Sequence, residues 1–197
     1  MTGDNWAVTP ETDDDLLFAS GAVAGAGALT LLRTTTGENG VGYKILFTSA
    51  GDSSARTWTI VGHAMGTDPG VSTSETVTAP NATTASSTNY YDRITSITAS
   101  GAMTGNQKVG ILGTSVALPR TRVQFVYFVA SGSAGSIVVN LNSTTGRQLL
   151  KVATPASATG TDSMHCPGSG ILTTGGGVND FGLVTLTNVT SATLVCG

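Results

Sequence analysis

The chain has 197 residues, of which 40% are hydrophobic and only 11% are charged, well below the roughly 25% of an average soluble domain. Nine basic and twelve acidic residues give a net charge of −3, which argues against a phosphate-binding surface built from clustered Lys and Arg. We therefore expect no nucleic-acid partner. A surface with so few charges provides little electrostatic repulsion between copies of the chain, which favours an oligomer.

The N-terminal segment, residues 1–39, differs in composition from the rest of the chain. It carries acids where a secretory signal would need a basic head and an apolar run. Its most apolar stretch, Leu16–Leu32, is interrupted by glycines and falls short of the ~20 apolar residues of a membrane span. We expect a chain made in a cytoplasm, with no membrane partner. The segment should form either a short helix that begins at Asp13–Asp15 or an extended arm that orders on a neighbouring subunit.

Beyond this segment, apolar residues recur in short runs bounded by Gly, Ser, Asn and Pro, which is typical of an all-β domain. Strands are predicted at Tyr43–Thr48, Arg56–Val61, Ser74–Thr78, Ile94–Ala99, Gln107–Leu112, Arg122–Val129, Ser136–Leu141, Gln148–Val152, Leu183–Leu186 and Ala192–Cys196. Connecting segments are expected at Gly62–Gly70, Ala79–Asn89, Ala153–Gly160 and Ser169–Val178. This spacing predicts a β-sandwich or jelly-roll-like fold. A break at Leu118–Arg120 would divide it into one module at 40–118 and another at 119–197.

Two runs allow predictions about side-chain direction. In Arg56–Val61, Trp58 and Ile60 should share the buried face of a half-buried strand. Ile94 and Ile97 are three residues apart, which breaks strict alternation and predicts either a β-bulge or a helical turn.

The chain offers few groups for nucleophilic catalysis or thiolate chemistry. His63 lies in a loop-like run, and no G-x-S-x-G motif accompanies either histidine. The adjacent pair His165–Cys166 could bind a metal or supply a thiolate, but neighbours in a strand point to opposite faces. Cys166 and Cys196 are too few for a disulfide framework, and we interpret them as buried thiols that either pair or stay free.

The acidic residues also lack a recognisable site pattern. Asp13–Asp15 does not have the spaced D-x-D-x-D-G ligands of a calcium loop, and Asp68, Asp162 and Asp180 are isolated. A carboxylate pair for glycoside hydrolysis could form only in the fold. The run Gly21–Gly27 lacks the lysine of a phosphate-binding loop. We predict no catalytic residue, no cofactor and no metal site, and therefore a protein that is not an enzyme.

The polar segment Glu75–Leu112 carries the one resemblance to a known family. A threonine-rich strand (Glu75–Thr78) leads to a turn (Ala79–Asn81), paired tyrosines (Tyr90–Tyr91) and a Thr-Ser-Ile-Thr strand (Thr95–Thr98). This order resembles structural proteins of tailed bacteriophages. The runs Leu149–Pro155 and Leu183–Leu194 are similar to the β-rich ends of small capsid-associated proteins.

The resemblance implies a non-enzymatic virion component. Within that class it favours a capsid decoration (cement) protein, often trimeric, that binds the major capsid protein or another virion protein. A tail, collar or fibre component is the closest alternative. A carbohydrate-binding β-sandwich is the alternative from another class, with Tyr90–Tyr91, Trp58 and Phe125–Phe128 as a stacking platform. The large apolar groups on both faces of Phe125–Phe128 instead predict a strand buried on both sides, in the centre of a sheet or at a subunit interface.

Overall fold

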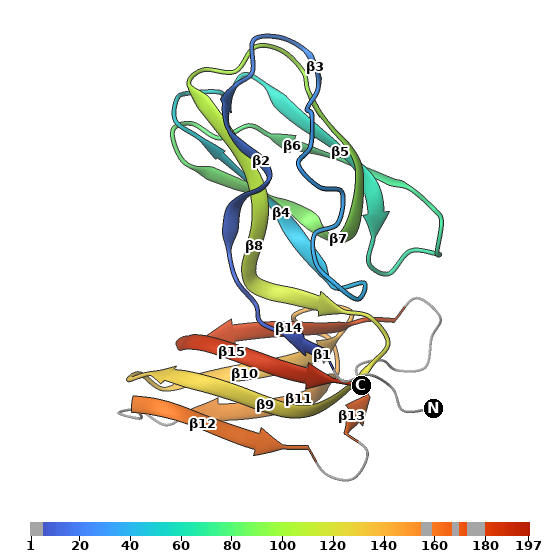
Figure 1. Ribbon diagram of the computed structural model, residues 1–197, viewed down its shortest axis with the longest axis vertical. Coiled ribbons are helices and arrows are strands. Elements are labelled where there is room, and N and C mark those ends of the chain that lie inside the picture. Colours follow the sequence, from blue (N-terminus) through green and yellow to red (C-terminus); the bar gives the residue numbers. More distant parts are fainter. Residues whose placement is uncertain (1–5, 155–158, 167–169, 173–179) are drawn as a thin grey trace. The chain divides into compact units, whose positions relative to one another are not determined.

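The computed structural model describes residues 6–154, 159–166, 170–172 and 180–197 (Figure 1). Within these ranges the chain is all-β with no helix, and its two antiparallel sheets give a sandwich-like fold, which confirms the predicted class. In the same ranges no helix is long and apolar enough to cross a membrane. The chain divides into two compact units: unit 1 contains Met1–Glu11 and Thr114–Gly197, and unit 2 contains Thr12–Gly113.

Unit 2 is built around strand β7 (Thr84–Ala99), the longest strand described. The strands follow the order β2–β8–β4–β7–β5–β6, and β3 pairs with β7. The first part of β7 pairs with β4 and the second part pairs with β5, so a single strand serves two partners in succession. The other strands are β2 (Asp13–Ala22), β3 (Gly27–Ala28), β4 (Gly42–Ser49), β5 (Thr57–Ala64), β6 (Thr73–Thr78) and the part of β8 (Asn106–Leu118) up to Gly113.

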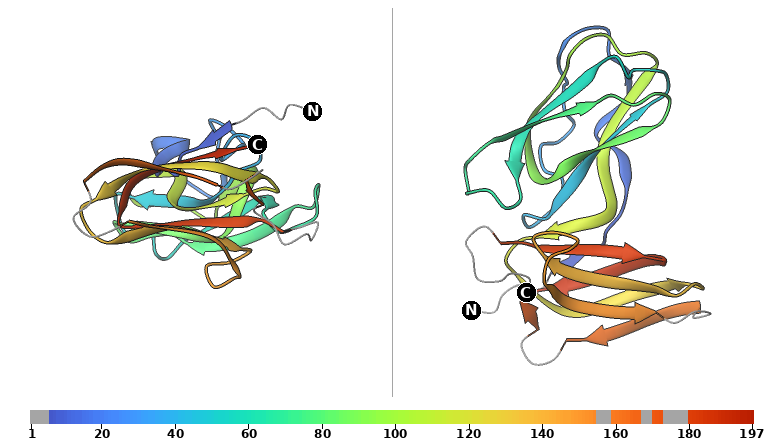
Figure 2. Two further views of the ribbon diagram at one scale, coloured as in Figure 1. Left: turned by 90° about the horizontal axis from the view of Figure 1, so that it is seen from below. Right: turned by 180° about the vertical axis from the view of Figure 1, so that it is seen from behind.

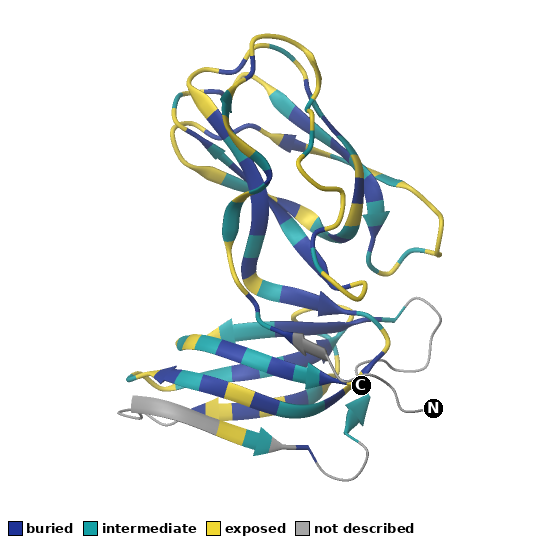
Figure 3. Cartoon of the chain, viewed as in Figure 1, coloured by how far each residue is buried: buried dark blue, intermediate teal, exposed yellow. Residues whose placement is uncertain are grey.

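The core of unit 2 contains large aromatic and branched side chains. Burial alternates along β5, and Trp58 and Ile60 are both fully buried, as the alternation predicted (Figure 3). The Trp58 ring stacks on Phe47 of β4, with centroids 5.3 Å apart and planes at 12°. Such a pair adds about 0.5–1.5 kcal/mol to the free energy of area burial.

Ile94 and Ile97 are both buried because β7 contains a β-bulge between them. Val61 lies opposite Ser96 and Gly62 lies opposite Ile94, which leaves Thr95 as an extra residue. The extra residue resets the alternation, so both isoleucines reach the core. The bulge alternative is therefore confirmed, and the helical-turn alternative is wrong.

Unit 1 contains two sheets that lie face to face (Figure 2). One has the order β1–β15–β9–β12, with β13 also paired to β9, and the other has β11–β10–β14–β8. Their strands are β1 (Trp6–Val8), the end of β8, β9 (Arg122–Ser131), β10 (Gly135–Leu141), β11 (Gln148–Thr154), β12 (Thr159–His165), β13 (Ile171–Leu172), β14 (Gly182–Thr187) and β15 (Val189–Cys196). Val126 and Leu194 in the first sheet, and Ile137 and Val184 in the second, are fully buried.

The N-terminal segment differs from both forms expected for residues 1–39. Asp13–Ala22 is strand β2, paired with β8, so the short-helix alternative is wrong. Leu17 is fully buried in the core of unit 2, which makes this stretch part of a folded unit instead of a separate arm. β1 pairs with β15 and belongs to unit 1.

The division between the units also falls a few residues before the expected break at Leu118–Arg120. It lies between Gly113 and Thr114, within strand β8. The end of β8 pairs with β14 of unit 1, from Ser115 to Leu118. Because β8 is continuous across this boundary, no turn marks it.

Every predicted strand overlaps a strand of the structure, but some expected connections are strand as well. Gly62–Ala64 belongs to β5, and Thr84–Asn89 belongs to β7. Strand β12 begins at Thr159, inside the expected connection Ala153–Gly160. Most of Ser169–Val178 lies outside the described residues.

Candidate functional site

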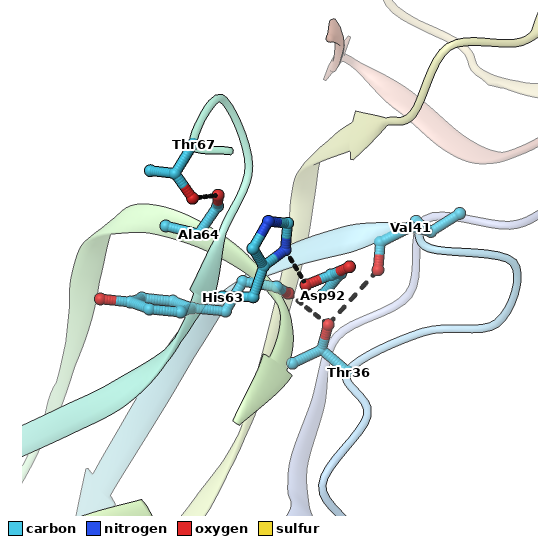
Figure 4. Close-up of polar contacts among 7 residues, drawn as sticks. Thr36, Val41, His63, Ala64, Thr67 and Asp92 are labelled. Atoms are coloured by element: carbon cyan, nitrogen blue, oxygen red, sulfur yellow. Dashed lines mark hydrogen bonds and ion pairs between the residues drawn. The ribbon is translucent and has the colours of Figure 1, made fainter. Parts of the chain in front are cut away.

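His63 lies on β5, not in a loop, and its side chain is hydrogen-bonded to that of Asp92 of β7 (Figure 4). The imidazole Nδ1 is 2.8 Å from Asp92 Oδ1, and the two side chains are 16% and 22% exposed. The second ring nitrogen, Nε2, is enclosed and has no hydrogen-bond partner within the part of the chain that the structure describes. A Ser–His–acid triad would need a hydroxyl at that nitrogen. The pair therefore lacks a nucleophile and ties β5 to β7.

The Thr36 and Thr67 hydroxyls, drawn beside this pair in Figure 4, donate hydrogen bonds to backbone carbonyl oxygens. Thr67 donates to the carbonyl oxygen of Ala64 at 2.7 Å. Thr36, which is buried, donates to the carbonyl oxygens of Tyr91 and Val41. Both side chains hold turns and neighbouring segments in place.

Cys166 and Cys196 are free, buried thiols, so they do not pair. They flank β9 on opposite sides: the Cys166 amide donates to the Gln124 carbonyl oxygen, and Cys196 lies opposite Val123. Two strand spacings place their Cα atoms roughly 10 Å apart, beyond the reach of a disulfide.

Burial raises the pKa of both thiols, that of Cys196 to about 12 with a smaller contribution from Cys166. Neither thiol is therefore a thiolate nucleophile at neutral pH. The side chain of His165 lies outside the described residues, so the structure does not place the His165–Cys166 pair.

Asp13, Asp14 and Asp15 bring their carboxylate oxygens within 4.8 Å of one another. Lys108 of β8 contacts both oxygens of Asp14, at 3.0 and 3.2 Å, and this hydrogen bonding raises the pKa of Lys108. The lysine partly offsets the acidic charge and joins β2 to β8, so we assign the cluster a structural role.

The remaining isolated acids show no shared site. Asp180 accepts a hydrogen bond from the Asn142 side chain at 2.8 Å in unit 1. Asp68 lies in unit 2, in the connection between β5 and β6, and the side chain of Asp162 lies outside the described residues.

The glycine-containing run Gly21–Gly27 borders a shallow groove of about 260 Å³. The groove is lined by Phe18 and residues 22–30, which carry no ionisable side chain. It therefore provides no cation for a phosphate and no acid–base group.

The segment with the family resemblance, Glu75–Leu112, forms β6, β7 and part of β8. Glu75 of β6 accepts hydrogen bonds from the amides of Thr88 and Asn89 and from the Tyr91 hydroxyl, the last two at 3.1 and 3.3 Å. These amides lie in a second bulge of β7, opposite Ile45 of β4. We call this arrangement the Glu75 clasp. Sequence reasoning missed it because Glu75 is thirteen residues from its first partner.

A buried amide supports the same segment at the start of β8. Gln107 is 1% exposed, and its Nε2 donates to the Thr104 carbonyl oxygen and to the Ser49 hydroxyl, both at 2.9 Å. Ser49 and Ser53 also bond with each other. These bonds satisfy Nε2 and join the start of β8 to Ser49 at the end of β4, whereas the buried Oε1 of Gln107 has no hydrogen-bond partner among the described residues.

In unit 1, Phe125–Phe128 is buried on one side within the described chain, and its burial on the other side at a subunit interface stays a prediction. β9 is central in its sheet, between β15 and β12, and Val126 and Phe128 point into the core. Tyr127 points outward and is 44% exposed. Its ring is nearly parallel to that of Phe125, with centroids 6.2 Å apart and planes at 15°.

No model of a known protein family and no curated protein sequence matches this chain. The function is therefore inferred from the residues and their geometry.

Proposed function

We propose that this chain is a non-enzymatic virion structural protein of a tailed bacteriophage, and that it decorates the head and stabilises the capsid lattice. The observation that carries the proposal is that the polar side chains of Glu75–Leu112 form hydrogen bonds that join strands. The Glu75 clasp and the Gln107 network hold strands and bulges together. The segment that resembles phage structural proteins thus uses these polar groups for architecture.

The low charge of the chain supports a contact role. Surfaces rich in Ser and Thr can be buried against a partner without the cost of removing many charges from water. On a repeating lattice, many weak contacts act together through a high effective concentration. The partner in this proposal is the major capsid protein or another virion protein, and the chain acts as a homo-oligomer, with a trimer favoured.

The test is quantitative mass spectrometry of purified particles of the phage that encodes this chain. A decoration protein should be present in hundreds of copies per particle, counted against the major capsid protein. A copy number of roughly a handful to dozens would identify a tail, collar or fibre component instead. Particles without the chain would contradict the whole proposal.

Carbohydrate binding is the second candidate, but two of the aromatic residues expected to form its stacking platform are buried. Trp58 and Tyr91 are fully buried and cannot stack on a sugar. Tyr90 is half-buried beside Lys44, whose Nζ lies 5.5 Å from its ring centroid. The observation that still favours this candidate is the exposed Tyr127 ring beside Phe125. Loss of glycan-array binding in the Tyr127→Ala variant would support it.

A further inference from the structure

Asn39 and Gly40 form a tight turn that leads into strand β4. Both residues have positive φ, 54° at Asn39 and 74° at Gly40, and the Val41 amide donates to the Glu38 carbonyl oxygen at 3.1 Å. An Asn-Gly pair with two positive φ angles is typical of a type I′ turn. Asn39 is the only asparagine of the chain that glycine follows. The turn therefore presents this one Asn-Gly bond at an exposed position.

Three asparagines of the described chain share this left-handed backbone, but they differ in how their side chains are held. φ is 59° at Asn142 and 49° at Asn188. The Asn142 side chain has two hydrogen bonds of 2.8 Å, and the Asn188 side chain donates to a backbone carbonyl oxygen at 2.9 Å. Within the described residues, neither the Asn39 side chain nor the Gly40 N–H has a hydrogen-bond partner. These two groups are therefore available to react with each other.

We propose that Asn39 is a site of spontaneous deamidation, with water as the only co-reactant. The Gly40 backbone nitrogen attacks Cγ of Asn39, an N–Cγ bond forms, and the bond between Cγ and Nδ2 breaks. The side-chain nitrogen leaves as ammonia with the proton of the Gly40 amide, and a cyclic succinimide remains. Water then adds to either ring carbonyl and gives aspartate or isoaspartate. In isoaspartate the chain continues through the side-chain carboxyl group.

The local structure favours this reaction at Asn39 over the other asparagines. Glycine has no Cβ to shield the attacking backbone nitrogen of Gly40. Ring closure requires Asn39 to rotate its carbonyl group out of the turn, which a single backbone hydrogen bond closes. Exposed backbone hydrogen bonds of this kind open readily. At Asn142 the two side-chain hydrogen bonds must break first, which slows the same reaction.

The isoaspartyl product should loosen the start of β4. It lengthens the backbone of the turn by a methylene group and adds a negative charge beside Glu38. The turn leads directly to Val41, which is 2% exposed and whose carbonyl oxygen accepts from the Thr36 hydroxyl. Thr36 also donates to the Tyr91 carbonyl oxygen on β7. A longer turn therefore displaces the contacts that hold this segment against the sheet.

The test is storage of the purified full chain in mildly alkaline buffer, which favours loss of the Gly40 amide proton, followed by tryptic mass spectrometry. Trypsin releases the turn in the peptide 34–44. This peptide should show the mass of an amide-to-acid conversion, and labelling with isoaspartyl methyltransferase should identify isoaspartate. The conversion should be at least about tenfold faster at Asn39 than at Asn142, because two hydrogen bonds hold the Asn142 side chain.

Two variants are the matched controls. Asn39→Gly keeps a sequence suited to a type I′ turn but has no amide to lose, so its peptide should stay unmodified. Asn39→Asp adds the negative charge without the extra methylene group. Hydrogen exchange at residues 41–47 should be at least about tenfold faster in the isoaspartyl fraction, isolated by chromatography, than in Asn39→Asp.

An unmodified peptide 34–44 after storage, or equal rates at Asn39 and Asn142, would overturn the proposed site. Hydrogen exchange that is as slow in the isoaspartyl fraction as in Asn39→Asp would overturn the loosening of β4.

Discussion

At the residue scale, Glu75 joins β6 to the irregular part of β7. Its carboxylate accepts from two amides of the β7 bulge and from the Tyr91 hydroxyl. Glu75→Ala leaves these donors without their acceptor, so we expect the free energy of unfolding to fall by about 1–3 kcal/mol. Urea unfolding of the full chain measures this loss.

Glu38→Ala is the matched control for the Glu75 clasp. Glu38 is exposed, and its replacement should change the free energy of unfolding by no more than about 0.5 kcal/mol. Equal losses in the two variants would show that the clasp contributes no specific stability.

Ionisation of Tyr91 should lower the free energy of unfolding in alkaline solution. Burial, with a smaller contribution from Glu75, raises the pKa of Tyr91 from 10.0 to about 12. The unfolded chain therefore releases this proton at lower pH than the folded chain. The stability is complete below pH 10 and falls as the pH rises towards 12. Urea unfolding across this range should show a steeper fall for the unaltered chain than for Tyr91→Phe, and equal slopes would contradict the prediction.

At the scale of the elements, the packing of β2 against β8 leaves no room for a side chain at Gly110. A Cβ at this position would meet the Asp13 carbonyl oxygen and the Asp14 backbone. Gly110→Ala must push the strands apart, so we expect a loss of about 1–3 kcal/mol in the free energy of unfolding. Gly25→Ala is the control, because nothing lies within 4 Å of a Cβ there; it should leave stability unchanged or raise it by up to about 1 kcal/mol. If both variants lose the same stability, the close approach of β2 and β8 has no energetic consequence.

Strands with clear alternation were predictable from sequence, whereas strands held by distant partners were not. Trp58 and Ile60 mark β5 by their spacing, and the irregular spacing of Ile94 and Ile97 marks the bulge. β2 has three acids followed by a short apolar run, which gives no period-two signal. Thr84–Asn89 is polar except for Ala85, and it becomes strand because β4 and Glu75 supply hydrogen-bond partners.

The contacts at the candidate site were also hard to predict from sequence, because their partners are distant along the chain. The His63–Asp92 pair joins residues 29 positions apart on β5 and β7, and no local pattern predicts it. The hydrophobic pattern of Phe125–Phe128 predicted a strand in the centre of a sheet, and β9 is central. Tyr127, on the outward face of β9, is exposed in this chain. A pattern of apolar residues predicts burial, but it does not reveal whether the covering surface belongs to the same chain.

At the scale of the whole molecule, the chain passes between its units twice, near Glu11 and within β8. Neither passage carries a linker rich in Gly or Pro, which is why the boundary could not be read accurately from composition. The division assigns the whole net charge of −3 to unit 2, whereas the four basic and four acidic residues of unit 1 cancel.

A cryo-EM reconstruction of the head of the encoding phage tests the central claim, that the chain decorates the head, most directly. The account predicts density on the outer head surface, repeated at equivalent lattice positions, into which both all-β units fit. A head surface without such density, at a resolution that traces the major capsid protein, would contradict it.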